Sequence, residues 1–131
     1  MTGHCNCGAV RFEIDGEPLG ASYCHCTRCQ RRTGAAASAQ LFVAPGSVRI
    51  LAGEDAIRGW SPPDGMRKEF CGECGSHLWS RPPGGDIAGV RLGVIDGDPG
   101  VRPTMRAWVS SAAVWEPLGD DGLTRHEGRR P

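Results

Sequence analysis

The chain has 131 residues, among them 20 glycines and 10 prolines, and its 15 basic and 15 acidic residues give a formal net charge of zero. This length predicts a single domain over residues 1–131, and the glycine and proline content argues against a bundle of long helices, because both residues are unfavourable inside a helix. Zero net charge weakens a general nucleic-acid-binding interpretation, and no apolar run approaches the roughly 18 residues that a membrane span needs. Residues 1–20 contain cysteines and acidic side chains instead of a signal peptide, so we expect a cytoplasmic protein.

Short stretches of alternating apolar and polar residues, separated by turns rich in glycine and proline, run along the whole chain. The strand candidates cover residues 9–14, 35–43, 47–51, 57–61, 87–95 and 105–109, and short segments at 66–70 and 77–80 lead into and out of a cysteine cluster. No window shows a helical period of useful length, and the tail from about residue 120 is polar, so we expect it to be loosely ordered. The pattern therefore predicts an all-β domain.

The seven cysteines fall into three clusters, at 5–7, 24–29 and 71–74, and none lies outside a cluster. An odd number excludes a complete set of intrachain disulfides, and closely spaced thiols in a cytosolic protein indicate metal ligands first. The alternative is a clustering of cysteines that act only as small hydrophobic residues. A thioredoxin-like redox motif at 71–74 is disfavoured, because Gly72 and Gly75 discourage the helix that such a motif opens.

Two of the clusters are pairs that each lack further ligands nearby. Structural zinc takes four ligands in a tetrahedron, often four cysteines, so we group Cys5 and Cys7 with Cys71 and Cys74. Such a site would tie the N-terminus to the middle of the chain and would support folding of a small, glycine-rich domain. Iron in a rubredoxin-like site of four sulfurs is the alternative.

The remaining cysteines, Cys24, Cys26 and Cys29, are one ligand short of a closed site. Three protein ligands with one exchangeable position are typical of catalytic zinc. If the segment from Cys24 to Cys26 is extended, His25 points away from the sulfurs, so we expect it beside the site or in its cleft. Two alternatives stay open: His25 as the fourth ligand, and a single four-ligand site with other pairings that leaves free thiols.

Three arginines, Arg28, Arg31 and Arg32, lie within or directly after this cluster. They would offset the charge of −1 that Zn²⁺ with three thiolates carries, and Arg28 and Arg31 are candidates for binding a substrate carboxylate through a bidentate contact. The alternative is a solvated surface. Three thiolates make zinc a weak Lewis acid, so a thiol is the fourth ligand that suits it best. A thiol ionised there would add to an electrophilic carbon such as that of an aldehyde.

The order C-x-C-G, then C-H-C-x₂-C, then F-C-x₂-C-G-S-x-L-W resembles the glutathione-dependent formaldehyde-activating enzyme family, which also includes centromere protein V. The resemblance runs from Gly3 to Ser111. It implies a β-tent fold of small antiparallel sheets around a Cys₄ zinc site. It also implies two zinc ions per chain, a structural one on the four paired cysteines and a catalytic one on the remaining three. The implied activity joins formaldehyde to glutathione and is classed as a carbon–sulfur lyase reaction.

These observations leave two hypotheses of different kinds. The first is a zinc enzyme that activates a small thiol for addition to an aldehyde, acting as a monomer or homodimer with no nucleic-acid or membrane partner. The second is a non-catalytic zinc module that binds another protein. A zinc-ribbon nucleic-acid binder is disfavoured by the zero net charge. The chain departs from the family at Arg106, where members often carry histidine.

Overall fold

A computed structural model describes all residues, 1–131, and consists of β-strands, one α-helix and three short 3₁₀ helices. The strands are β1 (Thr2–His4), β2 (Arg11–Ile14), β3 (Gly20–Cys24), β4 (Ser38–Phe42), β5 (Val48–Ala52), β6 (Ile57–Trp60), β7 (Arg67–Cys71), β8 (His77–Arg81), β9 (Gly89–Arg91), β10 (Met105–Ala107) and β11 (Thr124–Arg125). The α-helix is α1 (Thr27–Thr33), and the 3₁₀ helices are Glu54–Ala56, Leu92–Val94 and Val109–Ser111. The predicted all-β class is confirmed. None of the helices has the length and hydropathy of a membrane-spanning segment.

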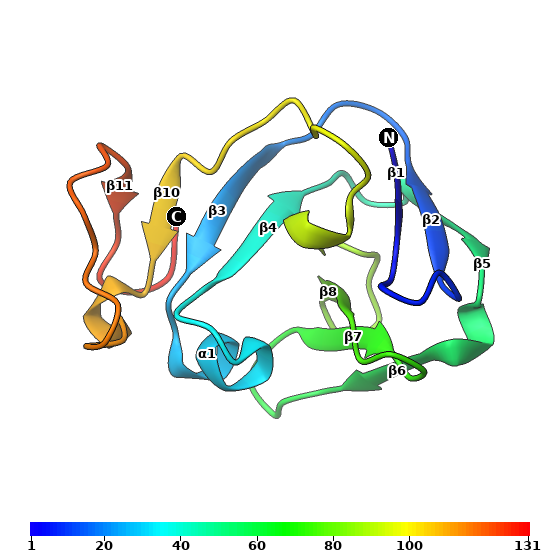
Figure 1. Ribbon diagram of the computed structural model, residues 1–131, viewed down its shortest axis with the longest axis horizontal. Coiled ribbons are helices and arrows are strands. Elements are labelled where there is room, and N and C mark those ends of the chain that lie inside the picture. Colours follow the sequence, from blue (N-terminus) through cyan, green and yellow to red (C-terminus); the bar gives the residue numbers. More distant parts are fainter.

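The strands form two sheets (Figure 1). The smaller sheet has the order β1-β2-β5, and the larger has the order β11-β10-β3-β4-β9-β8-β7-β6. Most neighbours are antiparallel, but β10 pairs in parallel with both β3 and β11. These parallel pairings were not expected from the sequence. They join residues far apart in the chain, which local patterns cannot reveal.

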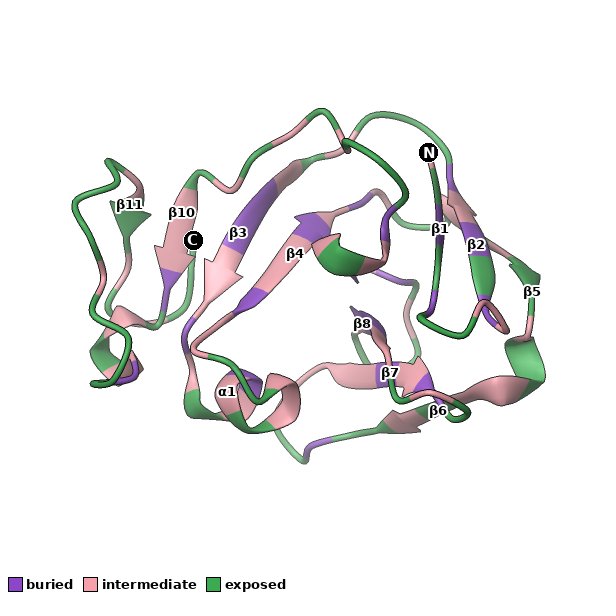
Figure 2. Cartoon of the chain, in the orientation of Figure 1, coloured by how far each residue is buried: buried purple, intermediate pink, exposed green.

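The core lies between the two sheets. Val90 of β9 pairs with Leu41 of β4 on one side and with Trp79 of β8 on the other, so the three side chains share one face of the larger sheet. Phe12 of the smaller sheet meets the Trp79 ring edge-on, with ring centroids 5.3 Å apart. All four side chains are fully buried, and Figure 2 shows the buried segments on β2, β3, β4 and β8.

The opposite face of the larger sheet is polar. Cross-strand pairing places Ser22, Gln40 and Arg91 in one row across β3, β4 and β9. Cys24 lies two residues beyond Ser22 and therefore points to the same side, toward α1, which packs against β4. The larger sheet thus separates an apolar core from a polar layer under the helix.

A buried carboxylate ties β7 to β8. Glu69 accepts a hydrogen bond from the indole Nε1 of Trp79, its cross-strand partner. It also forms ion pairs with Arg67, at 3.0 Å, and with Arg81, at 2.9 Å. Because Glu69 is only 7% exposed, its charge is compensated entirely by these neighbours.

Two local differences from the predicted elements have clear causes. The strand expected over 87–95 stops after Arg91, and the chain turns into a 3₁₀ helix around Gly93, which lacks the side chain that would favour a strand. Helix α1 was not predicted. Its seven residues are too few to display an amphipathic period, and it ends at Gly34, which adopts the left-handed conformation with φ of 68°.

Candidate metal centres

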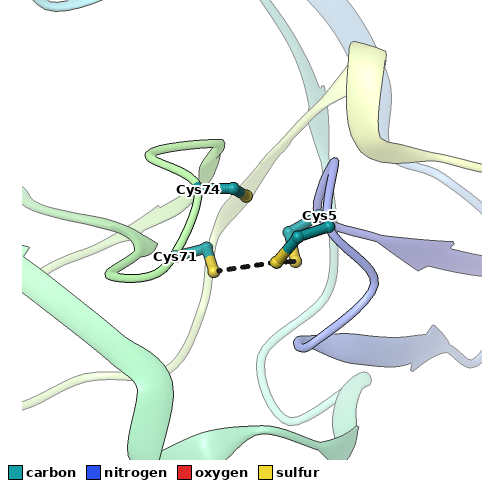
Figure 3. Close-up of side chains that lie close together, drawn as sticks. Cys5, Cys71 and Cys74 are labelled. Carbon is teal, nitrogen blue, oxygen red and sulfur yellow. Dashed lines mark hydrogen bonds between the residues drawn. The ribbon is translucent and has the colours of Figure 1, made fainter.

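The structure brings the two cysteine pairs together. The sulfurs of Cys5, Cys7, Cys71 and Cys74 all lie within 4.8 Å of one another. The Sγ atoms of Cys5 and Cys7 are 3.5 Å apart and those of Cys7 and Cys71 are 3.9 Å apart. Figure 3 shows the labelled side chains converging from two separate segments of the chain. Four sulfurs at 2.3 Å from a central zinc would be about 3.8 Å apart in a tetrahedron, so the arrangement fits a tetrathiolate metal site.

Each pair is held by local hydrogen bonds that leave the sulfurs facing inward. The Cys5 sulfur, after β1, accepts a hydrogen bond from the backbone N–H of Val10 at 3.2 Å. The turn after β7 closes through the N–H of Gly75, which donates to the carbonyl of Cys71 at 2.8 Å and has φ of 77°. Ser76 holds the pKa of the Cys74 thiol at about 5, through its hydroxyl first and its backbone second. A thiolate is thus favoured at Cys74.

Cys24, Cys26 and Cys29 form a second group, again with their sulfurs within 4.8 Å. Cys24 ends β3, Cys26 precedes α1 as its N-cap, and Cys29 lies in the first turn. The sulfur of Cys26 accepts a hydrogen bond from the N–H of Cys29 at 3.3 Å, so one of the three thiols initiates the helix that positions another. No fourth cysteine, histidine or acidic residue belongs to this group.

The three thiols differ in their ease of ionisation. Hydrogen bonds from Cys24 and then Cys26 lower the pKa of Cys29, with a smaller contribution from the charge of Arg91. Hydrogen bonds with Cys26 and then Cys29, followed by burial, raise the pKa of Cys24. Cys29 is also the most buried member of the group.

His25 lies outside the second group of sulfurs. Its Nε2 is 3.0 Å from Nη1 of Arg106, and its backbone N–H donates to the carbonyl of Ala107 at 2.9 Å. Burial, and next the charge of Arg106, lower the pKa of His25, so the ring accepts a hydrogen bond as a neutral base. Arg106 also pairs with Asp121 at 2.7 Å and lies over the ring of Tyr23. Arg106, the residue that departs from the family pattern, thus contacts His25 directly.

The arginines of α1 border a pocket of about 440 Å³ beside the helix. It is lined by Thr27, Arg28, Arg31, Arg32 and Trp60. Arg28 already has a carboxylate partner, Asp64, at 2.8 Å, and its guanidinium lies over the Trp60 ring. Arg31 is exposed. Of the two predicted anion-binding residues, only Arg31 is free of an acidic partner.

Sequence reasoning missed two cations near the second group, Lys68 of β7 and Arg91 of β9. Arg91 is 6% exposed and donates from Nη1 to the side-chain oxygen of Gln40 at 2.7 Å. A signal for it was present, because Arg91 interrupts an apolar run and alternates with Val90 and Leu92. Alternation places such a residue on the opposite face of a strand, where a buried arginine needs a polar environment.

Comparisons with known proteins agree with the motifs. The model of the glutathione-dependent formaldehyde-activating enzyme family matches residues 1–111. A Halomonas elongata protein named "Putative glutathione-dependent formaldehyde-activating enzyme" is 29% identical over 87 residues, which are 60% of this chain and 54% of that protein. The chain therefore spans about half the length of this curated relative. The crystal structure of a Rhodobacter sphaeroides protein has a TM-score of 0.58 and 26% identity over 75% of this chain and 90% of that chain. The family match covers most of the sequence, including all three cysteine clusters, so the chain belongs to the glutathione-dependent formaldehyde-activating enzyme family.

Proposed function

We propose that this chain is a zinc-dependent enzyme of the carbon–sulfur lyase type, which activates a small thiol such as glutathione for addition to formaldehyde or a related aldehyde. The observation that carries the proposal is the second cysteine group, in which three sulfurs converge and no fourth protein ligand is present. Family membership and the name of the Halomonas relative support glutathione and formaldehyde as the reactants.

In this proposal the four-cysteine group holds a structural zinc. The sulfur separations suit that ion, and all four tetrahedral positions would be filled by the protein. Cys5 and Cys7 lie between β1 and β2 of the smaller sheet, whereas Cys71 ends β7 and Cys74 lies in the turn between β7 and β8 of the larger one. The proposed metal therefore joins the two sheets next to the core that they share.

The three-cysteine group would hold the second zinc. Zinc on three thiolates supplies an exchangeable position and favours the ionised form of a thiol placed there. In the overall reaction the thiol loses its proton, the sulfur forms a bond to the aldehyde carbon, the C=O π electrons move to oxygen, and that oxygen takes up one proton in place of the one the thiol released. The product is a hydroxymethyl thioether.

The chain's own residues orient this site. His25, between Cys24 and Cys26, is held by two hydrogen bonds. Its Nε2 accepts one from Arg106, and its backbone N–H donates one to the carbonyl of Ala107.

A second candidate function is a non-catalytic zinc module that binds another protein. Three large apolar side chains near the C-terminus favour it: Trp108 is 40% exposed, Trp115 64% and Val114 95%. Exposed apolar side chains that gather on one segment are typical of partner-binding surfaces. This function would need the structural zinc and the fold, but it would not need a ligand to exchange at the three-cysteine group.

Metal analysis and exchange spectroscopy separate the two functions. We expect two zinc ions per chain, falling to one in Cys26→Ala with the circular dichroism spectrum retained. A single zinc in the unaltered chain would overturn the open-site argument. Magnetisation-exchange NMR on glutathione plus formaldehyde should show faster adduct formation with the unaltered chain than with Cys26→Ala. Equal rates with both proteins, and without protein, would exclude this substrate pair.

A further inference from the structure

The polar layer between α1 and the larger sheet contains three basic side chains close to the three-cysteine group. They are Arg32 of α1, Lys68 of β7 and Arg91 of β9. The pKa of Lys68 is lowered by burial and by the charge of Arg91, and is raised by Cys29. The pKa of Arg32 is lowered by the same burial and by Arg91. Each cation therefore lies within electrostatic range of the others and of the Cys29 sulfur.

Several hydrogen-bond donors in this layer have no partner in the protein. Both terminal nitrogens of Arg32 and the Nε of Arg91 are fully buried and unpaired. The hydroxyls of Ser22 and Ser38 on the same face of the sheet are unpaired as well. None of the three cations forms an ion pair with a carboxylate of the chain. A buried guanidinium without a partner is costly, so the layer is built around something that the chain itself does not provide.

The proposed metal accounts for only part of this charge. Zn²⁺ with three thiolates carries a net charge of −1, which one neighbouring cation compensates. The three basic side chains carry +3 together, so two positive charges remain. A guanidinium presents parallel N–H donors that match the two oxygens of a carboxylate, and the serine hydroxyls add further donors.

One residue of this layer also borders a surface pocket. Arg32 lines the pocket beside α1, and its terminal nitrogens are buried. Trp60, another lining residue, is the cross-strand partner of Lys68. The pocket therefore borders Arg32 directly and lies next to the strand pair that carries Lys68.

We propose that Arg32, Lys68 and Arg91 form a carboxylate-binding subsite that selects thiols carrying a carboxylate. The inference rests on the proposed function, because it assigns the substrate's acidic group to residues beside the open metal position. It differs from the sequence-based expectation, which gave this task to Arg28 and Arg31.

The test measures binding by isothermal titration calorimetry, independently of turnover, on the zinc-loaded chain. The probes are 3-mercaptopropionate, 2-mercaptoethanol, and propionate, which has the carboxylate without the thiol. We expect mercaptopropionate to bind at least about tenfold more tightly than mercaptoethanol, because a hydrogen bond to a charged group contributes about 1.5–3 kcal/mol. Arg32→Gln and Lys68→Gln should each reduce this ratio. Arg31→Gln is the matched control, since it removes the neighbouring, exposed arginine of the same helix, and it should leave the ratio unchanged.

The outcomes distinguish the inference from the proposed function. Equal affinity for the two thiols, with two zinc ions bound, would overturn the carboxylate subsite and leave the thiol-activating function standing. Propionate binding as tightly as mercaptopropionate would overturn the assignment to a thiol substrate. If Arg32→Gln lowers the zinc content without changing the ratio, the cations only neutralise the metal centre and the inference is wrong. Failure of every thiol to bind would refute the proposed function itself.

Discussion

The two cysteine groups should differ sharply in what they contribute to stability. The first group joins Cys7 to Cys71 across 64 positions of the chain, whereas Cys24 and Cys29 of the second are five positions apart. The comparison uses two double variants that are matched in burial. Cys71→Ser with Cys74→Ser removes one buried and one half-buried thiol from the first group. Cys26→Ser with Cys29→Ser does the same in the second.

The size of the difference follows from loop closure. A cross-link that closes a loop of 64 residues restricts the unfolded chain by about 4 kcal/mol, and one that closes a loop of five residues by about 2 kcal/mol. The burial of the replaced atoms is similar in both variants and cancels. We therefore expect the first variant to lose about 2 kcal/mol more unfolding free energy than the second, a large share of the total stability of a small domain.

Urea denaturation of the zinc-loaded proteins, followed by tryptophan fluorescence, measures both losses. Zinc content is determined on the same samples, so that each variant is known to have lost only its own metal. Equal losses, or a larger loss in the Cys26 and Cys29 variant, would refute the assignment of the first group as the cross-link between the sheets.

Two further substitutions test the fold around the sites. Gly53→Ala should destabilise the chain more than Gly16→Ala: both glycines have positive φ, at 76° and 79°, but a Cβ at Gly53 would overlap the carbonyl of Ala9, whereas the space at Gly16 is open. Urea denaturation checks this order, and equal losses would contradict it. Glu69→Gln should cost about 1–3 kcal/mol, because it removes a buried charge that several donors share. Glu73→Gln, at an exposed position in the same region, should have almost no effect on the thermal midpoint, and a comparable drop there would contradict the argument.

The sequence predicted those parts of the site that local spacing and chemistry determine. The sequence predicted that Cys5 and Cys7 lie close to Cys71 and Cys74, because these were the only two incomplete pairs available to combine. The structure brings the four sulfurs together. The position of His25, away from the sulfurs, followed from the alternation of side chains in an extended segment. Each cysteine pair and the His25 segment is recognisable within a few residues of the chain, although the two pairs lie 64 positions apart.

The cations of the polar layer depend instead on tertiary structure. Arg91 and Lys68 lie on strands that reach the second cysteine group only through the pairing order β4-β9-β8-β7. No short motif encodes that order, so sequence reasoning selected the arginines adjacent to the cysteines in the chain. Arg28 proved to be paired with Asp64, a partner that is also remote in sequence.

The different placement of the two groups explains how one small domain could combine a permanent and an exchangeable metal position. Cys5 and Cys7 lie between β1 and β2 of the smaller sheet, and Cys71 and Cys74 come from the end of β7 and the turn after it in the larger sheet. The first group therefore connects the two sheets, and every position of its proposed metal is filled by the protein. The second group is confined to the end of β3 and the start of α1, on the polar face, where the core does not depend on it. A ligand can therefore enter and leave there without separating the sheets. The unpaired donors on that face are tolerated because the stability of the fold is supplied on the other side of the same sheet.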